Sequence, residues 1–391
     1  EVAIIGGGFG GLGTAIRLLQ EGKDNFILFE RAKEIGGTWR DNIYPGCACD
    51  VPSNLYSFSF EQNPEWSRLF PRQPEILDYL NHCVDKYNLK PYIRCNTAIT
   101  KLEFDEQEGF WRIYDQHGQC FTARLVVSAT GPLNRPNIPD IKGLNNFKGP
   151  YFHSSEWDYS VDLKNKTIGV IGTGASAIQF VPEIAPEVKQ LYLFQRTPPW
   201  IVPRPDKEVS GWKKRLYRRF PLLQHLVRSM IYWTFEFRVL GLMGNRRILN
   251  YMSKLSREHL EEQVTDPDLL EKLRPNYEIG CKRVLVSDNY YPTLARENIE
   301  LVTEGIQEIK TNGILSKTEV ERNIDVLIFA TGFHAAEFDF EVAVKGLNGQ
   351  SLNEQWAETG PQAYSGTAIS GYPNLLLLVG PNTGLGHNSI V

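Results

Sequence analysis

Two glycine-rich segments with the same spacing constrain the fold of this 391-residue chain more than any other feature. Both have the pattern Gly-x-Gly-x-x-(Gly/Ala), made by Gly6, Gly8 and Gly11 in the first and by Gly172, Gly174 and Ala177 in the second. An apolar run precedes each pattern, and a second apolar run follows some 20 residues later. This order of strand, tight turn, helix and strand binds dinucleotides, with the pyrophosphate at the helix N-terminus. We therefore predict two dinucleotide-binding (Rossmann-like) domains in an α/β protein.

The residue that ends each unit indicates which nucleotide binds there. The first unit ends at Glu30 and the second at Arg196, each 19 residues after the last position of its pattern. A carboxylate accepts hydrogen bonds from a bare ribose, whereas a guanidinium suits a 2'-phosphate, which predicts NADPH at the second site. A hydride from NADPH needs an acceptor, and FAD is the commonest dinucleotide acceptor with a bare ribose. We predict FAD at the first site.

The order of the motifs predicts a nested domain organisation, with the second domain inserted in the first. Residues 1–140 and 325–391 are expected to form the FAD-binding domain, and residues 141–324 the NADP-binding domain. A helical insertion is expected at about 207–275. Two buried-strand runs, 126–131 and 325–332, both end in Ala-Thr-Gly, and a helix is expected from Gln73 because Pro74 suits the first helical turn.

Composition narrows the class of protein. With 42% hydrophobic residues and a net charge of −4, the chain has ample apolar content for two cores and no basic excess that would favour nucleic acid. The six cysteines and seven histidines show no metal-ligand spacing, so we predict no metal site and a cytoplasmic location. The chain has no initiating Met and ends at Asn388–Val391, where a helix is expected to begin, so we expect a fragment trimmed at both ends.

The insertion contains one unusual stretch, residues 212–243. It begins with a basic and aromatic run and continues as an apolar run interrupted by Arg228, Glu236 and Arg238. These charges argue against a transmembrane span. Two interpretations remain: a peripheral contact with an anionic membrane surface, or a helical cap packed on the NADP domain with a solvated basic face.

The segment between the two domains carries the most specific signature. It reads Phe147-x-Gly149-x-x-x-His153-x-x-x-Trp157-Asp158, and a second motif comprises Gly36-Gly37-Thr38-Trp39, Tyr44-Pro45-Gly46 and Asp50. On these motifs the chain resembles the type I Baeyer-Villiger monooxygenases throughout its length. Related flavin monooxygenases that oxidise sulfur and nitrogen commonly end the linker motif with Tyr or Phe, so Trp157-Asp158 favours oxidation of a carbonyl. Without the resemblance, His153 and Trp157 would be read as structural residues, and with it as hinge residues that couple domain movement to cofactor binding.

The resemblance also implies roles for individual residues. Arg283 would lie over the flavin ring and stabilise a C4a-peroxyflavin and the oxyanion of its ketone adduct, with Asp50 holding its orientation. Lys282, Arg196 and Thr197 would hold the 2'-phosphate of NADPH. Further cofactor contacts are expected from Thr38, Trp39 and Asp50, and from Thr331 and Gly332, where the second Ala-Thr-Gly strand would end beside a nucleotide. The implied reaction converts a ketone to an ester or lactone with NADPH and O2.

Two other functions stay open, and a third is disfavoured. A sulfur or nitrogen oxygenase would take a thioether or amine in place of a ketone. A non-catalytic, membrane-recruited flavoprotein would use the basic insertion alone. A pyridine-nucleotide disulfide reductase would use Cys47 and Cys49 as a redox pair, but their single-residue spacer argues against it, and free thiols without an assigned role fit better.

Overall fold

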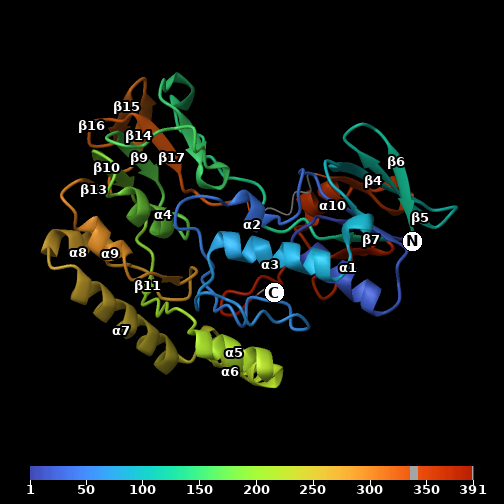
Figure 1. Ribbon diagram of the computed structural model, residues 1–391. Helices are drawn as coiled ribbons and strands as arrows, with labels where there is room; N and C mark the ends of the chain where they lie inside the picture. Colours follow the sequence, from blue (N-terminus) through green and yellow to red (C-terminus); the bar gives the residue numbers. More distant parts are fainter. Residues whose placement is uncertain (335–341, 390) are drawn as a thin grey trace.

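Each glycine-rich turn follows the central strand of a five-stranded parallel sheet in the computed structural model (Figure 1). The structure describes residues 1–334, 342–389 and 391. The first sheet has the order β19-β7-β1-β2-β3 and comprises β1 (Val2–Ile5), β2 (Phe26–Phe29), β3 (Ile93–Arg94), β7 (Leu125–Ser128) and β19 (Leu375–Leu377). The second has the order β13-β10-β9-β17-β8 and comprises β8 (Tyr151–His153), β9 (Thr167–Ile171), β10 (Gln190–Phe194), β13 (Ile299–Val302) and β17 (Val326–Phe329). The sequence-based prediction of two dinucleotide-binding folds is confirmed.

The two folds repeat the same local geometry around their glycines. The strands β7 and β17, which lead into the two Ala-Thr-Gly sequences, pair in parallel with β1 and β9. Gly6 and Gly172 have φ values of +111° and +105°, and a Cβ at either position would collide with a carbonyl oxygen, of Ala129 or Ala330 respectively. Glycine is therefore required at both positions by the crossing of the neighbouring strand.

Helices follow the glycine turns, as expected. α1 (Phe9–Gln20) buries Gly11, Leu12, Ala15 and Ile16, which recur on one face and pack toward the first sheet. α4 (Ala177–Ile184) begins at the fully buried Ala177. The expected helix at Gln73 is α3 (Gln73–Lys86), with Pro74 in its first turn. The remaining helices of the two folds are short: α2 (Thr38–Asp41), α9 (Tyr290–Leu294), α10 (Leu352–Thr359), and the 3₁₀ turns η1 (Lys90–Tyr92), η2 (Leu144–Asn146), η3 (Ser154–Glu156) and η4 (Leu347–Gly349).

Smaller sheets complete each fold. The first fold carries a four-stranded sheet of order β18-β4-β5-β6, made of β4 (Ile99–Asp105), β5 (Phe110–Asp115), β6 (Cys120–Ala123) and β18 (Ala343–Lys345). The second fold carries an antiparallel meander of β14 (Ile306–Lys310), β15 (Gly313–Ser316) and β16 (Glu321–Asn323), and the pair β11 (Ile201–Val202) and β12 (Leu285–Val286).

The sequence predicted that the chain returns to the first fold at residue 325. In the structure this return occurs later. β17 pairs with β8 and β9 and so belongs to the second sheet, and the next strand among the described residues, β18, pairs with β4 of the first fold. An apolar run such as 326–329 fits any buried strand, so only the hydrogen-bonded partners decide its sheet. Residues 380–389, which lead into the helix expected at the end of the sequence, form turns and irregular structure, and residue 390 of the expected helix start lies outside the described residues.

The helices of the insertion lie along one edge of the molecule, at the bottom and lower left of Figure 1. They are α5 (Gly211–Arg219), α6 (Pro221–Leu242), α7 (Arg246–Gln263) and α8 (Pro267–Leu273). α7 packs against β11 of the second fold, but α6 contacts the first: Arg228 Nη1 donates to the carbonyl of Leu55 at 2.8 Å. The expected cap on the NADP domain is thus observed for α7, while α6 also contacts the first fold, where a charge that interrupts its apolar run binds a backbone carbonyl.

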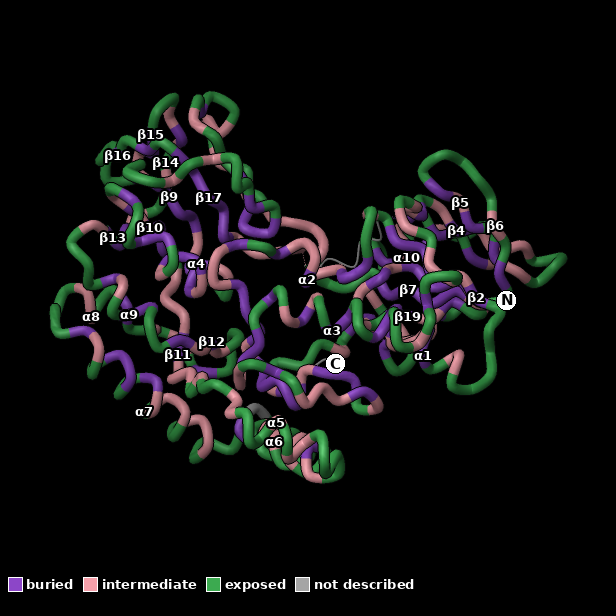
Figure 2. Tube along the Cα trace, viewed as in Figure 1, coloured by how far each residue is buried: buried purple, intermediate pink, exposed green. Residues whose placement is uncertain are grey.

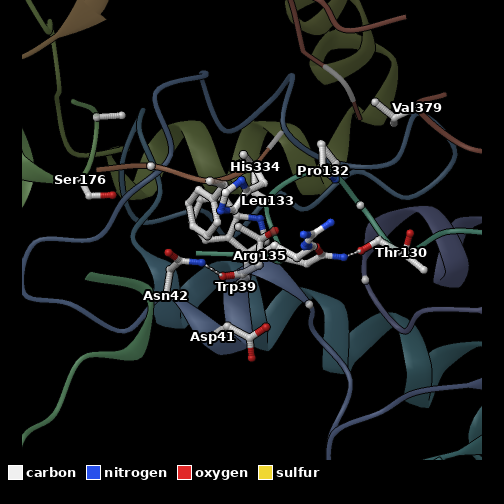
Figure 3. Close-up of a pocket in the computed structure, with 18 of the residues that line it drawn as sticks. Trp39, Asp41, Asn42, Thr130, Pro132, Leu133, Arg135, Ser176, His334 and Val379 are labelled. Atoms are coloured by element: carbon white, nitrogen blue, oxygen red, sulfur yellow. Dashed lines mark hydrogen bonds between the residues drawn. The ribbon is translucent and has the colours of Figure 1, made fainter. Parts of the chain in front are cut away.

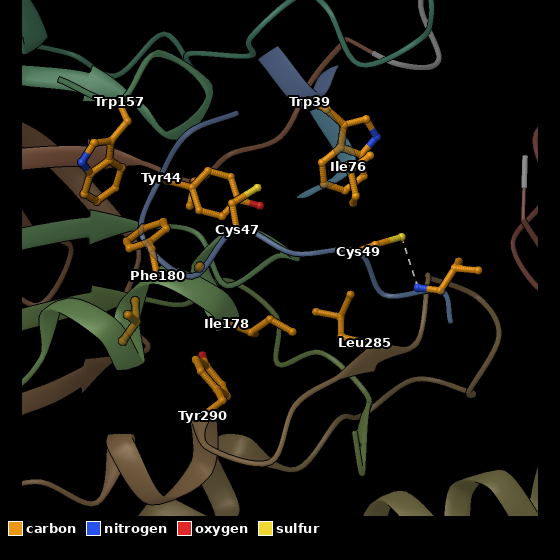
Figure 4. Packing of buried hydrophobic residues seen from close by; sticks show 14 of the residues in the cluster. Trp39, Tyr44, Cys47, Cys49, Ile76, Trp157, Ile178, Phe180, Leu285 and Tyr290 are labelled. Carbon is orange, nitrogen blue, oxygen red and sulfur yellow. Dashed lines mark hydrogen bonds between the residues drawn. The ribbon is translucent and has the colours of Figure 1, made fainter. Parts of the chain in front are cut away.

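The two folds share a packed aromatic cluster where they meet. The rings of Trp157 and Phe180 are 5.2 Å apart, and those of Tyr44 and Phe180 are 6.1 Å apart (Figure 4). Tyr44 comes from the first fold, Trp157 from the linker and Phe180 from α4. This cluster joins three segments that are far apart in the sequence at the junction of the two folds.

Candidate active site

A cavity of about 1090 Å³ lies between the two glycine turns and is lined by both folds. Its volume slightly exceeds the usual range for small-molecule sites, about 300–1,000 Å³. Figure 3 shows side chains from α2, from the segment after β7 and from the segment after β17 around this space. The predicted site residues that line the cavity are Gly6, Gly8, Glu30, Thr38, Trp39, Asp50, Gly172, Gly174, Arg196, Thr197, Lys282, Arg283, Thr331 and Gly332.

At the first turn, the carboxylate of Glu30 is buried beneath the glycines, with 4% of the residue exposed. Its Oε2 accepts from the backbone N–H of Gly7 at 2.8 Å, and its Oε1 accepts from Arg40 Nη1 at 2.8 Å. Burial lowers the pKa of Arg40, but its bonds to Asp41 and Glu30 outweigh burial and raise the pKa above its usual value. A carboxylate held in place at the end of β2 is the acceptor that a ribose diol requires.

The middle glycines of the two turns differ from the first ones. A Cβ at Gly8 would have Gly37 Cα as its nearest neighbour at 3.8 Å, and one at Gly174 would have Ala330 O at 3.9 Å, both ordinary contacts. Neither position needs glycine for its protein neighbours, although both line the cavity. Open space at these positions is compatible with the close approach of a pyrophosphate that dinucleotide sites require.

Two cations of the second fold line the cavity. Arg196, which follows β10, is exposed, and Lys282 lies 4.9 Å from the centre of the Tyr277 ring. Thr197 is held by its carbonyl, which accepts from Thr173 Oγ1 at 3.4 Å. The cluster of positive charge lies on the second fold and Glu30 on the first, so the two halves of the cavity suit different nucleotides.

Between the two turns, Arg283 and Asp50 form an ion pair across the domains. Asp50 Oδ2 accepts from Arg283 Nη2 at 2.6 Å and from Nε at 3.0 Å, although 233 residues separate the partners. The Arg283 side chain is 47% exposed and that of Asp50 is 26% exposed, so the guanidinium retains a face toward the cavity. Burial lowers the pKa of Arg283, but the Asp50 carboxylate outweighs it and raises the pKa, which keeps the group cationic.

The two cysteines beside Asp50 are not activated thiols. Burial raises the pKa of Cys47 to about 11 and raises that of Cys49 as well. Thiol-disulfide chemistry needs a thiolate, which a depressed pKa favours. Their environment therefore argues against the disulfide reductase alternative. Within the part of the chain that the structure describes, no cluster of three or more His, Cys, Asp or Glu residues could hold a metal ion.

The residues of the linker signature lie outside the cavity, and packing accounts for several of them. A Cβ at Gly149 would collide with the carbonyl oxygen of Asp325, and Phe147 is buried in the core of the second fold. His153 is fully buried, its Nδ1 lies 2.8 Å from Ser155 Oγ, and burial lowers its pKa against a smaller raising effect from the Gly332 backbone.

The last residue of the signature, Asp158, is exposed, whereas Phe147 and His153 before it are buried. Trp157 belongs to the aromatic cluster at the domain junction, and Asp158 is exposed, with its Oδ1 accepting from Ser160 N and Oγ. The bonds from Ser160 lower the pKa of Asp158. Gly11 and Ala177, the third positions of the two glycine patterns, are buried in their helices and do not line the cavity.

One residue that the sequence reading missed connects the folds directly. Gln179 of α4 donates from Nε2 to the carbonyl of Ala48 at 3.0 Å, and its Oε1 accepts from the N–H of Ala48 at 3.2 Å and from Tyr44 Oη at 3.0 Å. The side-chain amide of Gln179 thus bonds both the N–H and the carbonyl of Ala48, as the backbone of a neighbouring strand would. The only sequence signal was a polar residue within the otherwise apolar run Ala177–Val181, which by itself does not identify a partner.

The two glycine turns face one cavity, and the residues that end the two units, Glu30 and Arg196, carry opposite charges. This arrangement defines an α/β protein that brings two dinucleotides together. Comparison with known proteins gives the family. The model of the flavin-binding monooxygenase-like family matches residues 1–350. A protein of Pseudomonas aeruginosa named Baeyer-Villiger monooxygenase is 52% identical over the whole chain, which covers 74% of that relative. The chain therefore belongs to the flavin-binding monooxygenase-like family, as the sequence motifs predicted.

Further relatives and solved structures agree with this assignment. A Baeyer-Villiger monooxygenase of Streptomyces coelicolor is 44% identical over the whole chain, which covers 75% of it. The crystal structure of cyclohexanone monooxygenase from Rhodococcus sp. Phi1 bound to NADP+ is 30% identical with a TM-score of 0.88, over 98% of this chain and 80% of that one. The OTEMO complex with FAD and NADP is 33% identical with a TM-score of 0.87, over 97% and 80%.

Proposed function

We propose that this chain carries the cofactor-binding and catalytic core of a Baeyer-Villiger monooxygenase, which uses NADPH and O2 to convert a ketone to an ester or lactone. The observation that carries the proposal is the Arg283–Asp50 pair, which lies in one cavity between a turn suited to FAD and a turn suited to NADPH. The names of the relatives at 52% and 44% identity support the same reaction.

The cofactor sites are assigned by chemistry. The first fold would hold FAD, with its ribose on Glu30 and its pyrophosphate over Gly8. The second fold would hold NADPH, with its pyrophosphate over Gly174 and its 2'-phosphate against Arg196 and Lys282. When bound, FAD takes a hydride from NADPH and activates O2. On this assignment residues 1 to about 140 and the segment after β17 form the FAD domain.

The residues between the cofactor sites have one chemical task, which is to stabilise negative charge. Arg283 presents a cation that stays protonated at any working pH, and Asp50 fixes the direction of its guanidinium through two hydrogen bonds. Oxygen insertion next to a carbonyl develops negative charge on the substrate oxygen, and a positioned cation stabilises that charge without reorganisation. Arg283 is the group in this cavity that we assign to this role.

The oxidation of sulfur or nitrogen is the alternative within the same family. Trp157-Asp158 at the end of the linker motif and the names of the similar proteins favour the ketone. A thioether substrate stays a second candidate because the same flavin chemistry oxidises soft nucleophiles. The cytoplasmic location stays a prediction, for which cell fractionation is the test.

The test is product analysis with the full-length protein. The protein should purify yellow with bound FAD, consume NADPH in preference to NADH, and give an ester or lactone from a panel of ketones by mass spectrometry. A matched thioether panel separates the two reactions. Colourless protein that takes up no FAD would contradict the flavoprotein assignment, and sulfoxide without any ester would favour the alternative.

A further inference from the structure

The outer face of α6, defined here by its exposed apolar residues, is unlike any other surface of the described chain. Its members recur every three or four residues and so lie along one side of the helix: Leu222, Leu226, Met230, Trp233, Phe237 and Leu240, followed by Met243. The exposed fractions of Leu222, Met230 and Trp233 are 79%, 70% and 67%. Apolar side chains are common singly on surfaces, but a continuous row of this kind marks an interaction site.

The opposite side of α6 is already attached to the protein. Gln224 Nε2 donates to Asn54 Oδ1 at 3.1 Å, Arg228 binds the Leu55 carbonyl, and Glu236 Oε1 accepts from Asn388 Nδ2 at 2.7 Å. These bonds fix the rotation of the helix about its axis, so the apolar row must face outward. Figure 2 shows α5 and α6 at the edge of the molecule, with much of their length exposed.

The charged residues near the apolar row of α6 indicate which kind of partner it binds. Residues 211–247 contain nine Lys and Arg residues against a single Glu, in a chain whose net charge is −4. Lys214, Arg218 and Arg228 bond to the first fold, whereas Lys213, Arg215, Arg219, Arg246 and Arg247 are exposed. On α5, Lys213 lies 5.8 Å from the centre of the Trp212 ring, and the Arg219 guanidinium lies 5.6 Å from that of Phe220. Cations next to exposed aromatic rings, beside an apolar helix face, are the composition of segments that lie at a lipid interface.

We propose that α5 and the outer face of α6 seat this protein on an anionic lipid surface, with α6 lying in the plane of the interface. The apolar row would enter the boundary between headgroups and acyl chains, while the Lys and Arg side chains would bind lipid phosphates. Among the described residues, no helix is both long and apolar enough to cross a membrane. A second copy of the chain fits the face less well, because two such strongly positive surfaces would repel each other.

The experiment is co-sedimentation of the full-length holoenzyme with vesicles of phosphatidylcholine alone or of phosphatidylcholine and phosphatidylglycerol in equal parts. The protein should pellet with the anionic vesicles only, and added salt should release it because salt screens the charges. The triple variant Lys213→Gln, Arg215→Gln, Arg219→Gln should bind about a hundredfold more weakly at low salt, since each charge near the surface contributes about fivefold. The matched triple variant Lys164→Gln, Lys166→Gln, Lys189→Gln, on exposed residues of the second fold, should bind as the wild type does.

A second pair of variants tests the apolar row. Met230→Gln with Trp233→Gln should weaken vesicle binding at least about tenfold, because insertion of these side chains is lost. Val320→Gln with Tyr364→Gln, exposed apolar residues elsewhere, is the control. The proposal is overturned if the full-length protein stays in the supernatant with anionic vesicles. It is also overturned if either control loses as much binding as its partner, or if Met230→Gln with Trp233→Gln dissociates a dimer or lowers the melting temperature without lipid, which would mean that protein covers the face.

Discussion

Replacement of Arg283 by alanine tests the proposed chemistry most directly. The guanidinium is about half exposed and its partner Asp50 is reached through two hydrogen bonds to one carboxylate oxygen. An ion pair with that exposure contributes at most about 1 kcal/mol to folding, because water screens it. The variant should therefore fold and bind FAD and NADPH, so a loss of product formation cannot be attributed to unfolding.

The expected effect on chemistry is much larger than the effect on stability. Loss of one positioned group that stabilises a developing oxyanion costs about 10²–10³ in rate. Flavin reduction can also slow in the variant, because negative charge accumulates near the same guanidinium. The rate of ester formation should fall by about two to three orders of magnitude. The diagnostic quantity is the ester formed per NADPH consumed, which should collapse while the remaining electrons appear as hydrogen peroxide.

The assay measures NADPH oxidation, ester and hydrogen peroxide in the same reaction. Arg296→Ala is the matched control, because Arg296 is exposed and does not line the cavity, and it should leave the ratio unchanged. Asp50→Asn, which keeps a hydrogen-bond acceptor without the charge, should lower the ratio less than Arg283→Ala does. Near-normal coupling in Arg283→Ala would refute the assignment and make the ion pair a structural link between the folds.

Three further predictions concern the cofactor turns and the linker. Arg196→Ala should raise the KM for NADPH about ten- to a hundredfold and leave NADH use nearly unchanged, since a charged hydrogen bond contributes about 1.5–3 kcal/mol; steady-state kinetics with both coenzymes would expose an error if the preference did not move. Gly8→Ala should keep the melting temperature but lose bound FAD, whereas Gly6→Ala should destabilise the fold itself because its φ is +111° and Ala129 O occupies the space of a Cβ; equal thermal stability of the two variants would contradict this. Because burial lowers the pKa of His153, the unfolded chain binds more protons here, so the free energy of unfolding should fall as the pH drops below about 6.5, and His153→Gln should flatten this dependence in urea titrations at several pH values. An unchanged slope in that variant would mean that other groups dominate the acid response.

The sequence by itself determined the two dinucleotide folds, because their signals are local. Glycines at fixed spacing are needed where the backbone turns sharply, and apolar runs at fixed distances supply the strands that flank each turn. Glu30 and Arg196 follow those strands directly, so their positions at the ends of β2 and β10 followed from the same local order. The family motifs added the ion pair of Arg283 and Asp50, which spacing alone does not predict.

The tertiary structure decided what depends on partners far apart in the chain. It assigned β17 to the second sheet, because a buried apolar run is compatible with either sheet until its hydrogen bonds are known. It placed Gln179 against Ala48, a contact for which the sequence holds no partner signal. It also fixed the rotation of α6 through Gln224, Arg228 and Glu236. Sequence periodicity can define an apolar face on a helix, but only the contacts on the opposite side decide whether that face is buried or turned toward solvent.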